Sequence, residues 1–138
     1  MTKGIVAERN LVKLLWKSGF AVLRPSASGA STKMTRPDII AGSRVKGLEY
    51  AIEVKTTRND RLYIAHESVD QLIEFSQRFG CQPILALKFK GKGKGWILVN
   101  PEQLSVTPSL NYKITLRDAL QIGIDFQTLI KERGSRQN

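Results

Sequence analysis

The sequence predicts one α/β domain in which helices flank a central mixed β-sheet. Its 138 residues fit a single compact domain, and a hydrophobic content of 41% is enough to form a core. Apolar residues recur at helical spacing in two segments, and short alternating or β-branched runs lie between and after them. Because helix, strands, helix and strands follow one another, we expect helices packed on a sheet around one core. The domain is expected over residues 3–130, with a polar, flexible tail at 131–138.

The first helix is expected over residues 4–18, and Gly19 ends it. Val12 and Leu15 share its apolar face, yet Glu8 lies on the same face. A carboxylate that points toward a core is costly unless a partner compensates its charge. Glu8 is therefore a candidate functional residue.

The remaining elements follow from alternation and from the positions of Pro and Gly. Residues 48–56 alternate, so Glu53 and Lys55 project from one face of a strand. A second helix is expected over 67–79, closed by Gly80. The other expected elements are strands at 20–23, 38–41 and 62–64, a loop at 25–36, a turn at 44–47, a hairpin of 84–89 with 96–99, a strand near 104–107, and helices at 116–121 and 125–131.

The charge of the chain predicts a polyanionic partner. There are 22 Lys and Arg residues against 12 Asp and Glu, a net charge of +10, which favours nucleic acid first and an acidic membrane surface second. A charge spread evenly for solubility is the alternative, but residues 24–46 carry five cations against Asp38 alone. Lys33 and Arg36, within that segment, are candidate DNA contacts. A second basic run, without any acid, consists of Lys88, Lys90, Lys92 and Lys94.

Cysteine usage and hydropathy predict an intracellular protein that does not enter a membrane. Cys81 is the only cysteine, so no intrachain disulfide can form and a reducing compartment is expected. The N-terminus lacks the apolar core of a signal peptide, and no apolar run is long enough to span a bilayer.

The candidate site joins Arg36-Pro37-Asp38 to Glu53-Val54-Lys55, with fourteen residues, 39–52, between the aspartate and the glutamate. Because both pieces are expected on strands, this spacing brings two carboxylates and an amine together at the end of a small sheet, and Glu8 would add a third carboxylate. Carboxylates that lie so near one another repel, and a hard divalent cation relieves the repulsion. Oxygen ligands favour Mg²⁺ or Mn²⁺, and the chain has no Cys and His set with zinc spacing.

Such a site suits phosphodiester hydrolysis. Lys55 is placed to orient the attacking water or to bind a non-bridging phosphate oxygen, and Arg24 to contact phosphate. Plainer interpretations exist, because Asp…Glu-x-Lys is a weak motif taken alone. Glu8 could form a buried ion pair with an arginine such as Arg24, and Lys55 could simply pair with Glu53 or Glu49.

Several segments match one known family in order. They are Gly4–Val12, Gly19–Arg24, Pro37–Gly42, Ala51–Lys55 and Ile73–Gly80, followed by Asn111-Tyr112 and the helical segment after it. Together they resemble the archaeal Holliday junction resolvases, Hjc and its relative Hje, over roughly residues 3–130. Several motifs in one order are far more specific than the carboxylate motif by itself.

The resemblance implies a restriction-endonuclease-like fold, a homodimer, and Mg²⁺-dependent nicking of two opposed strands in a four-way DNA junction, in recombination and repair. Mn²⁺ is expected to substitute for Mg²⁺. By motif position, the implied metal ligands are Glu8, Asp38 and Glu53, and the implied catalytic lysine is Lys55. The resemblance further implies DNA contacts by Arg9 and Arg24, a catalytic-loop serine at Ser28 or else Ser26, and a dimer interface at Phe75 and Phe79, for which core packing is the alternative.

The expected function is therefore that of a junction-resolving endonuclease. One alternative is another nuclease of the same fold that acts on duplex or damaged DNA. The other is a basic module that binds nucleic acid without cleaving it, although such a binder gains nothing from acids that face a phosphate backbone. The number of metal ions, and the binding of a sliding clamp or other recombination proteins, stay open.

Overall fold

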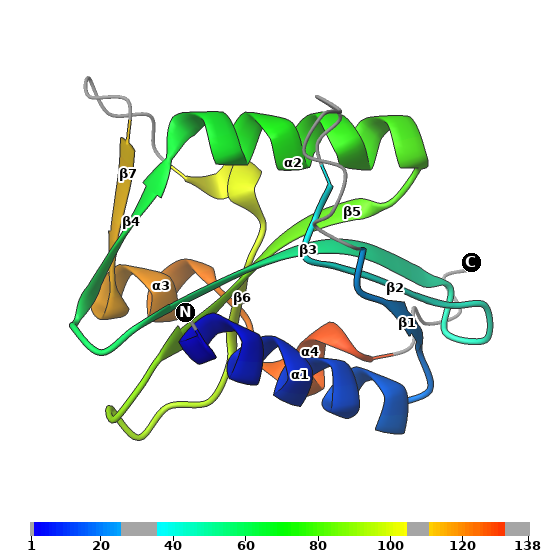
Figure 1. Ribbon diagram of the computed structural model, residues 1–138, viewed down its shortest axis with the longest axis horizontal. Helices are drawn as coiled ribbons and strands as arrows, with labels where there is room; N and C mark the ends of the chain where they lie inside the picture. The colour runs from blue at the N-terminus through cyan, green and yellow to red at the C-terminus, as the bar shows by residue number, and fades with distance from the viewer. Residues whose placement is uncertain (1, 26–35, 105–110, 132–138) are drawn as a thin grey trace.

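The structure is a computed structural model that describes residues 2–25, 36–104 and 111–131 (Figure 1). Most of the predicted loop at 25–36, with Ser28 and Lys33, lies outside the described residues, as do 105–107 of one predicted strand and 132–138 of the tail. None of the described helices is long and apolar enough to cross a membrane.

A five-stranded sheet of order β1-β2-β3-β5-β6 forms the centre of the molecule, and β4 pairs with β7 in a separate two-stranded sheet. Strands β3 and β5 are parallel, whereas the other pairs are antiparallel. This confirms the predicted α/β class and the mixed sheet. The elements are α1 (Thr2–Lys17), β1 (Ala21–Leu23), β2 (Ile39–Ser43), β3 (Leu48–Thr57), β4 (Arg61–Ala65), α2 (His66–Phe79), β5 (Gln82–Phe89), β6 (Ile97–Val99), the 3-10 turn η1 (Pro101–Gln103), β7 (Asn111–Thr115), α3 (Leu116–Ile122) and α4 (Phe126–Leu129).

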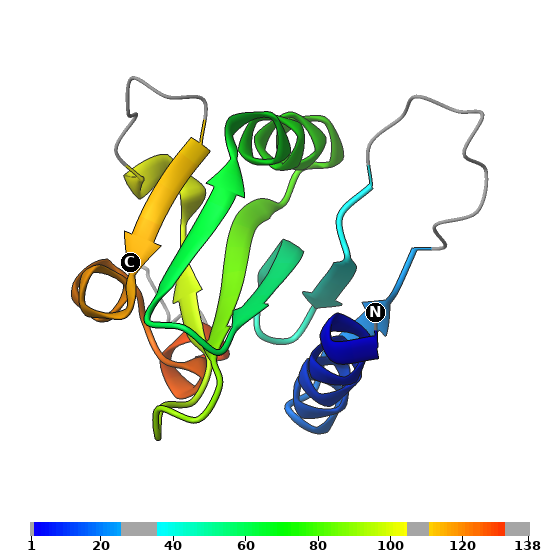
Figure 2. The same ribbon diagram turned by 60° about the vertical axis from the view of Figure 1, so that its left-hand side comes forward.

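Two hydrophobic clusters cover the two faces of the five-stranded sheet. On one face, α1 and α4 pack through residues such as Leu11, Leu15 and Leu129; on the other, α2 and α3 pack through residues such as Val69 and Ala119. Figures 1 and 2 show α2 on the opposite side of the sheet from α1. The sheet is therefore buried on both faces, and polar side chains reach solvent only toward its edges and strand ends.

Strand β3 shows how this burial shapes the site. The alternation in its sequence correctly predicts one apolar face, with Tyr50 and Ile52 packed in the cluster under α1. Its other face is buried too, because Ala51 packs in the cluster under α2. From Glu53 onward the strand is only half-buried, so the functional side chains emerge where the two layers of helices end.

Helix α2 follows its prediction closely. It ends where Gly80 adopts a left-handed conformation, with φ of 90°, and the Gly80 amide donates to the carbonyl of Ser76. Only glycine adopts this conformation without a steric penalty. The buried residues of the helix are Val69, Leu72 and Ser76.

The segment after β6 differs from its prediction. A strand near 104–107 is wrong at Leu104, because the Asn100 side chain accepts a hydrogen bond from the Glu102 amide and Pro101 starts a 3-10 turn that Leu104 ends. The strand in this region is β7, whose Tyr112 and Ile114 are buried against β4. The two C-terminal helices are present as α3 and α4, and α4 is shorter than the predicted 125–131.

Candidate active site

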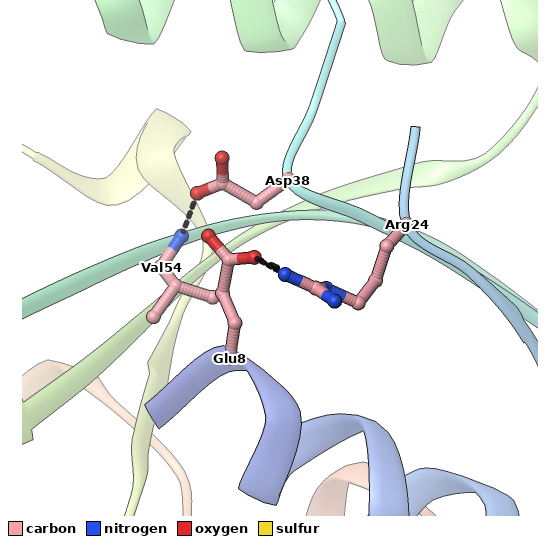
Figure 3. Close-up of polar contacts among 4 residues, drawn as sticks. All are labelled: Glu8, Arg24, Asp38 and Val54. Carbon is pink, nitrogen blue, oxygen red and sulfur yellow. Dashed lines mark hydrogen bonds and ion pairs between the residues drawn. The ribbon is translucent and has the colours of Figure 1, made fainter. Parts of the chain in front are cut away.

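Asp38 and Glu53 are brought together by the antiparallel pairing of β2 with β3. Ile39 pairs with Ile52, which places Asp38 alongside Glu53. One oxygen of Asp38, Oδ2, accepts a hydrogen bond from the backbone amide of Val54 at 2.8 Å (Figure 3). This amide lies between Glu53 and Lys55, so the bond fixes Asp38 against the motif. The predicted meeting of Asp38 with the Glu53-Val54-Lys55 motif is therefore confirmed.

Glu8 reaches the same region from α1. It points up from the helix toward the strand that carries Val54, below Asp38 (Figure 3). Arg24, just after β1, holds one of its oxygens: Nη2 and Nε lie 3.2 and 3.3 Å from Glu8 Oε1. The ion pair considered as an alternative is therefore present. It is not a buried one, since the Arg24 side chain is 37% exposed.

Lys55 lies beside Glu53 on the same strand. Its Nζ is 3.8 Å from Glu53 Oε2, and both side chains are only partly exposed, at 31% and 21%. The predicted common projection of these two side chains from β3 is thus confirmed, and so is the simple ion pair. The two are compatible, because a charge contact of this length leaves the ammonium able to donate to another oxygen.

The electrostatics of the site show an excess of negative charge. Burial raises the pKa of Glu53 to about 7; the neighbouring Asp38 carboxylate raises it and Lys55 lowers it. Burial also raises the pKa of Asp38, opposed by the Val54 hydrogen bond, and the charge of Glu8 adds to the rise. Negative charge on neighbouring carboxylates therefore adds to burial in disfavouring the ionisation of Asp38 and Glu53.

A divalent cation fits this donor set. Within the described residues, no three acidic, His or Cys groups form a ready-made metal cluster, and Arg24 already engages one oxygen of Glu8. The donors are nevertheless hard oxygens, and repulsion from neighbouring carboxylates adds to burial in raising the pKa values of Asp38 and Glu53. A hard cation such as Mg²⁺ matches both properties.

The other candidate residues lie around this centre or away from it. Arg9 is exposed on α1, next to Glu8, and Arg36 is exposed before Pro37. Phe75 and Phe79 stack on α2 with ring centroids 5.4 Å apart, and Phe79 is 58% exposed. Core packing therefore does not account for Phe79.

A small pocket beside Glu53 contains residues that the sequence did not single out. It has a volume of about 70 Å³ and is lined by Arg36, Pro37, Glu53, Ser68, Gln71 and Leu72. Ser68 and Gln71 are polar and only half-buried on a helix whose apolar face packs on the sheet. Their spacing of three residues puts them on one side of α2, but nothing local in the sequence indicates that this side faces Glu53.

Comparison with known proteins identifies the family. Residues 1–137 match the family described as archaeal Holliday junction resolvase (Hjc). The crossover junction endodeoxyribonuclease Hjc of Methanocaldococcus jannaschii is 41% identical over 128 residues, which cover 93% of this chain and 86% of that protein. The enzyme of the same name from Archaeoglobus fulgidus is 40% identical over 114 residues, which cover 82% of this chain and 79% of that protein.

A solved structure agrees with the sequence matches. The 1.6 Å structure of Archaeoglobus fulgidus Hjc, a Holliday junction resolvase from an archaeal hyperthermophile, superposes with a TM-score of 0.81 at 31% identity. The match covers 92% of this chain and 99% of that one. The fold, the order of the motifs and the family match agree, and the chain belongs to the Hjc family of archaeal Holliday junction resolvases.

Proposed function

We propose that the protein is an endonuclease that resolves four-way DNA junctions by hydrolysing one phosphodiester bond on each of two opposed strands. Its relatives carry the name crossover junction endodeoxyribonuclease, and the chain spans most of their length. The observation that supports a catalytic role for this chain's own residues is the bond from the Val54 amide to Asp38 at 2.8 Å. It holds the aspartate against Glu53 and Lys55.

In this proposal Glu8, Asp38 and Glu53 hold Mg²⁺, for which Mn²⁺ substitutes. When bound there, the ion would supply a water molecule of lowered pKa and positive charge to offset that of the phosphate. Lys55 donates a hydrogen bond to the reacting phosphate or to the attacking water. Asp38 and Glu53 enter the reaction ionised, and Lys55, on the same strand as Glu53, favours that form of Glu53.

The remaining candidate residues guide the DNA and pair two subunits. Arg9, Arg24, Lys33 and Arg36 contact phosphates, and Ser28 acts near the scissile bond. Phe75 and Phe79 take part in a homodimer interface, which the exposure of the stacked Phe79 ring on α2 supports. A two-fold dimer offers two equivalent sites to a junction that has approximate two-fold symmetry.

A cleavage assay tests this function directly. The purified protein is incubated with a synthetic four-way junction and, separately, with its component duplexes, in Mg²⁺ and in EDTA. We expect paired nicks on opposed strands of the junction, dependent on the metal, and little cutting of the duplexes. Equal cutting of linear duplex would favour the duplex nuclease instead, and tight binding without any nick would favour the non-catalytic module.

Arg24→Ala should weaken both junction binding and cleavage. The variant loses a phosphate contact and leaves Glu8 without the guanidinium that now lies 3.2 Å away. We expect junction affinity to fall by about tenfold at low salt and the slope of log K against log [salt] to fall by about one. Fluorescence anisotropy titrations over a range of salt concentrations measure both. Arg44→Ala, in the turn between β2 and β3, is the matched control, and an unchanged salt slope in Arg24→Ala would contradict the assignment.

A further inference from the structure

Beyond the candidate site, one end of the central sheet carries concentrated positive charge. Two residues after Lys55, β3 ends at Thr57. Its parallel neighbour β5 ends at Phe89, which pairs with Thr57. The Lys90 amide donates to the Thr57 carbonyl at 2.8 Å. The turn after β3 and the turn after β5 therefore lie side by side, as Figures 1 and 2 show. We call their cations the basic end, which consists of Arg58, Arg61, Lys90, Lys92 and Lys94.

Within the two segments that form the basic end, little acidic charge offsets the cations. Residues 57–65 and 88–96 contain one acid, Asp60, which pairs with Arg61 at 3.4 Å. The turn from 91 to 95 is exposed throughout. Gly91 and Gly93 have φ of 75° and 72°, which a tight turn between the lysines requires and other residues rarely adopt. Several cations gathered on two adjacent turns give this end a positive potential, which favours the binding of an anion.

The chemistry of the surface favours phosphate over a protein partner. Arg58, Arg61 and Lys92 line an open hollow of about 410 Å³, whose other lining residues are Asn59, Asp60 and Tyr63. No aliphatic side chain lines the hollow to anchor a protein segment. Its long cationic side chains and its polar lining residues suit a sugar-phosphate backbone.

The distance between the basic end and the candidate active site matches a short length of duplex DNA. Arg58 follows Lys55 by three residues, or about 10 Å of strand at 3.3 Å per residue. That length corresponds to about three base pairs of duplex at 3.4 Å each. We propose that the basic end binds the phosphates of one junction arm, from about three base pairs beyond the cleaved bond outward. The identity of the ligand rests on the proposed function, whereas the basic end shares no residue with the phosphate contacts proposed at Arg9, Arg24, Lys33 and Arg36.

A double-mutant cycle between protein and DNA tests this proposal. The variant K92Q/K94Q removes two cations from the turn after β5. The control R44Q/K46Q removes two cations from the turn between β2 and β3, in the same sheet. The DNA partner is a junction with neutral methylphosphonate linkages at about the third to sixth phosphates of each of two opposed arms, counted from the cleaved bond, so that the contacts of both subunits of the proposed dimer are removed. Binding is measured in EDTA, and unfolding curves check that each variant is folded.

We expect the neutral linkages to weaken wild-type binding by about tenfold and K92Q/K94Q to weaken binding to the unmodified junction by a similar factor. The two changes together should cost little more than either alone, because both remove the same contacts. R44Q/K46Q should respond to the neutral linkages as the wild type does. Fully additive losses, or equal losses in both variants, would overturn the proposal. Because the cycle measures binding alone, it can be interpreted whether or not the junction is cleaved, so a failure of the proposed function is seen separately in the cleavage assay.

Discussion

Glu53→Gln and Asp38→Asn should each lower the rate of junction cleavage by about a thousandfold or more. Losses of this size are typical when a preorganised catalytic group is removed. Both substitutions keep the size of the side chain and remove its negative charge. Asp38→Asn also weakens the bond with the Val54 amide, which is 2.8 Å long in the wild type. Single-turnover cleavage of a labelled junction in saturating Mg²⁺ measures the loss.

Junction binding should behave in the opposite way. In the proposed mechanism the carboxylates lie where a phosphate approaches, so removal of one negative charge should leave affinity unchanged or raise it. Glu49→Gln is the matched control, because Glu49 lies on β3 four residues before Glu53 but is exposed. It should cleave at the wild-type rate. Full activity in either Glu53→Gln or Asp38→Asn would remove the proposed catalytic role of that residue.

The part of the site that could be predicted from sequence is the part that local pairing determines. Asp38 and Glu53 meet because a short turn at 44–47 joins two antiparallel strands, and strand alternation then puts Lys55 on the side of Glu53. Periodicity and turn residues carry that information. The helical phase of α1 likewise indicates an acid near the core at Glu8, although it does not say which cation would pair with it.

The rest depends on contacts between distant segments. The guanidinium of Arg24 meets Glu8 because β1 pairs at the edge of the sheet above α1, and no local pattern encodes that approach. β7 was missed for a similar reason. Its five residues are stabilised as a strand by β4, about fifty positions earlier in the chain. In the sequence, the basic end is recognisable only as a run of lysines. Its two arginines join the lysines because the parallel pairing of β3 with β5 brings two turns together.

The buried charge at Glu53 has a consequence for stability in metal-free buffer. Burial raises the pKa of its carboxyl from 4.5 to about 7, and the side chain is 21% exposed. Below pH 4.5 the group is protonated in both the folded and the unfolded state, and it adds no pH dependence. Between the two pKa values the folded state keeps a proton that the unfolded state has lost, so the free energy of unfolding falls as pH rises. Above about pH 7 the penalty is complete, at about 3 kcal/mol for a pKa change of this size.

Glu53→Gln should therefore stabilise the metal-free protein, by up to about 3 kcal/mol at pH 8 and by little at pH 4. Urea unfolding of wild type and variant in EDTA, at several pH values between 4 and 8, measures the difference. Glu49→Gln, which removes an exposed charge from the same strand, should show no such trend. A Glu53→Gln protein that is no more stable than the wild type at pH 8 would contradict the electrostatic account. The expected gain in stability also explains how Glu53 can favour the proposed activity and oppose folding. Its negative charge destabilises the metal-free protein, and the same charge would bind a cation.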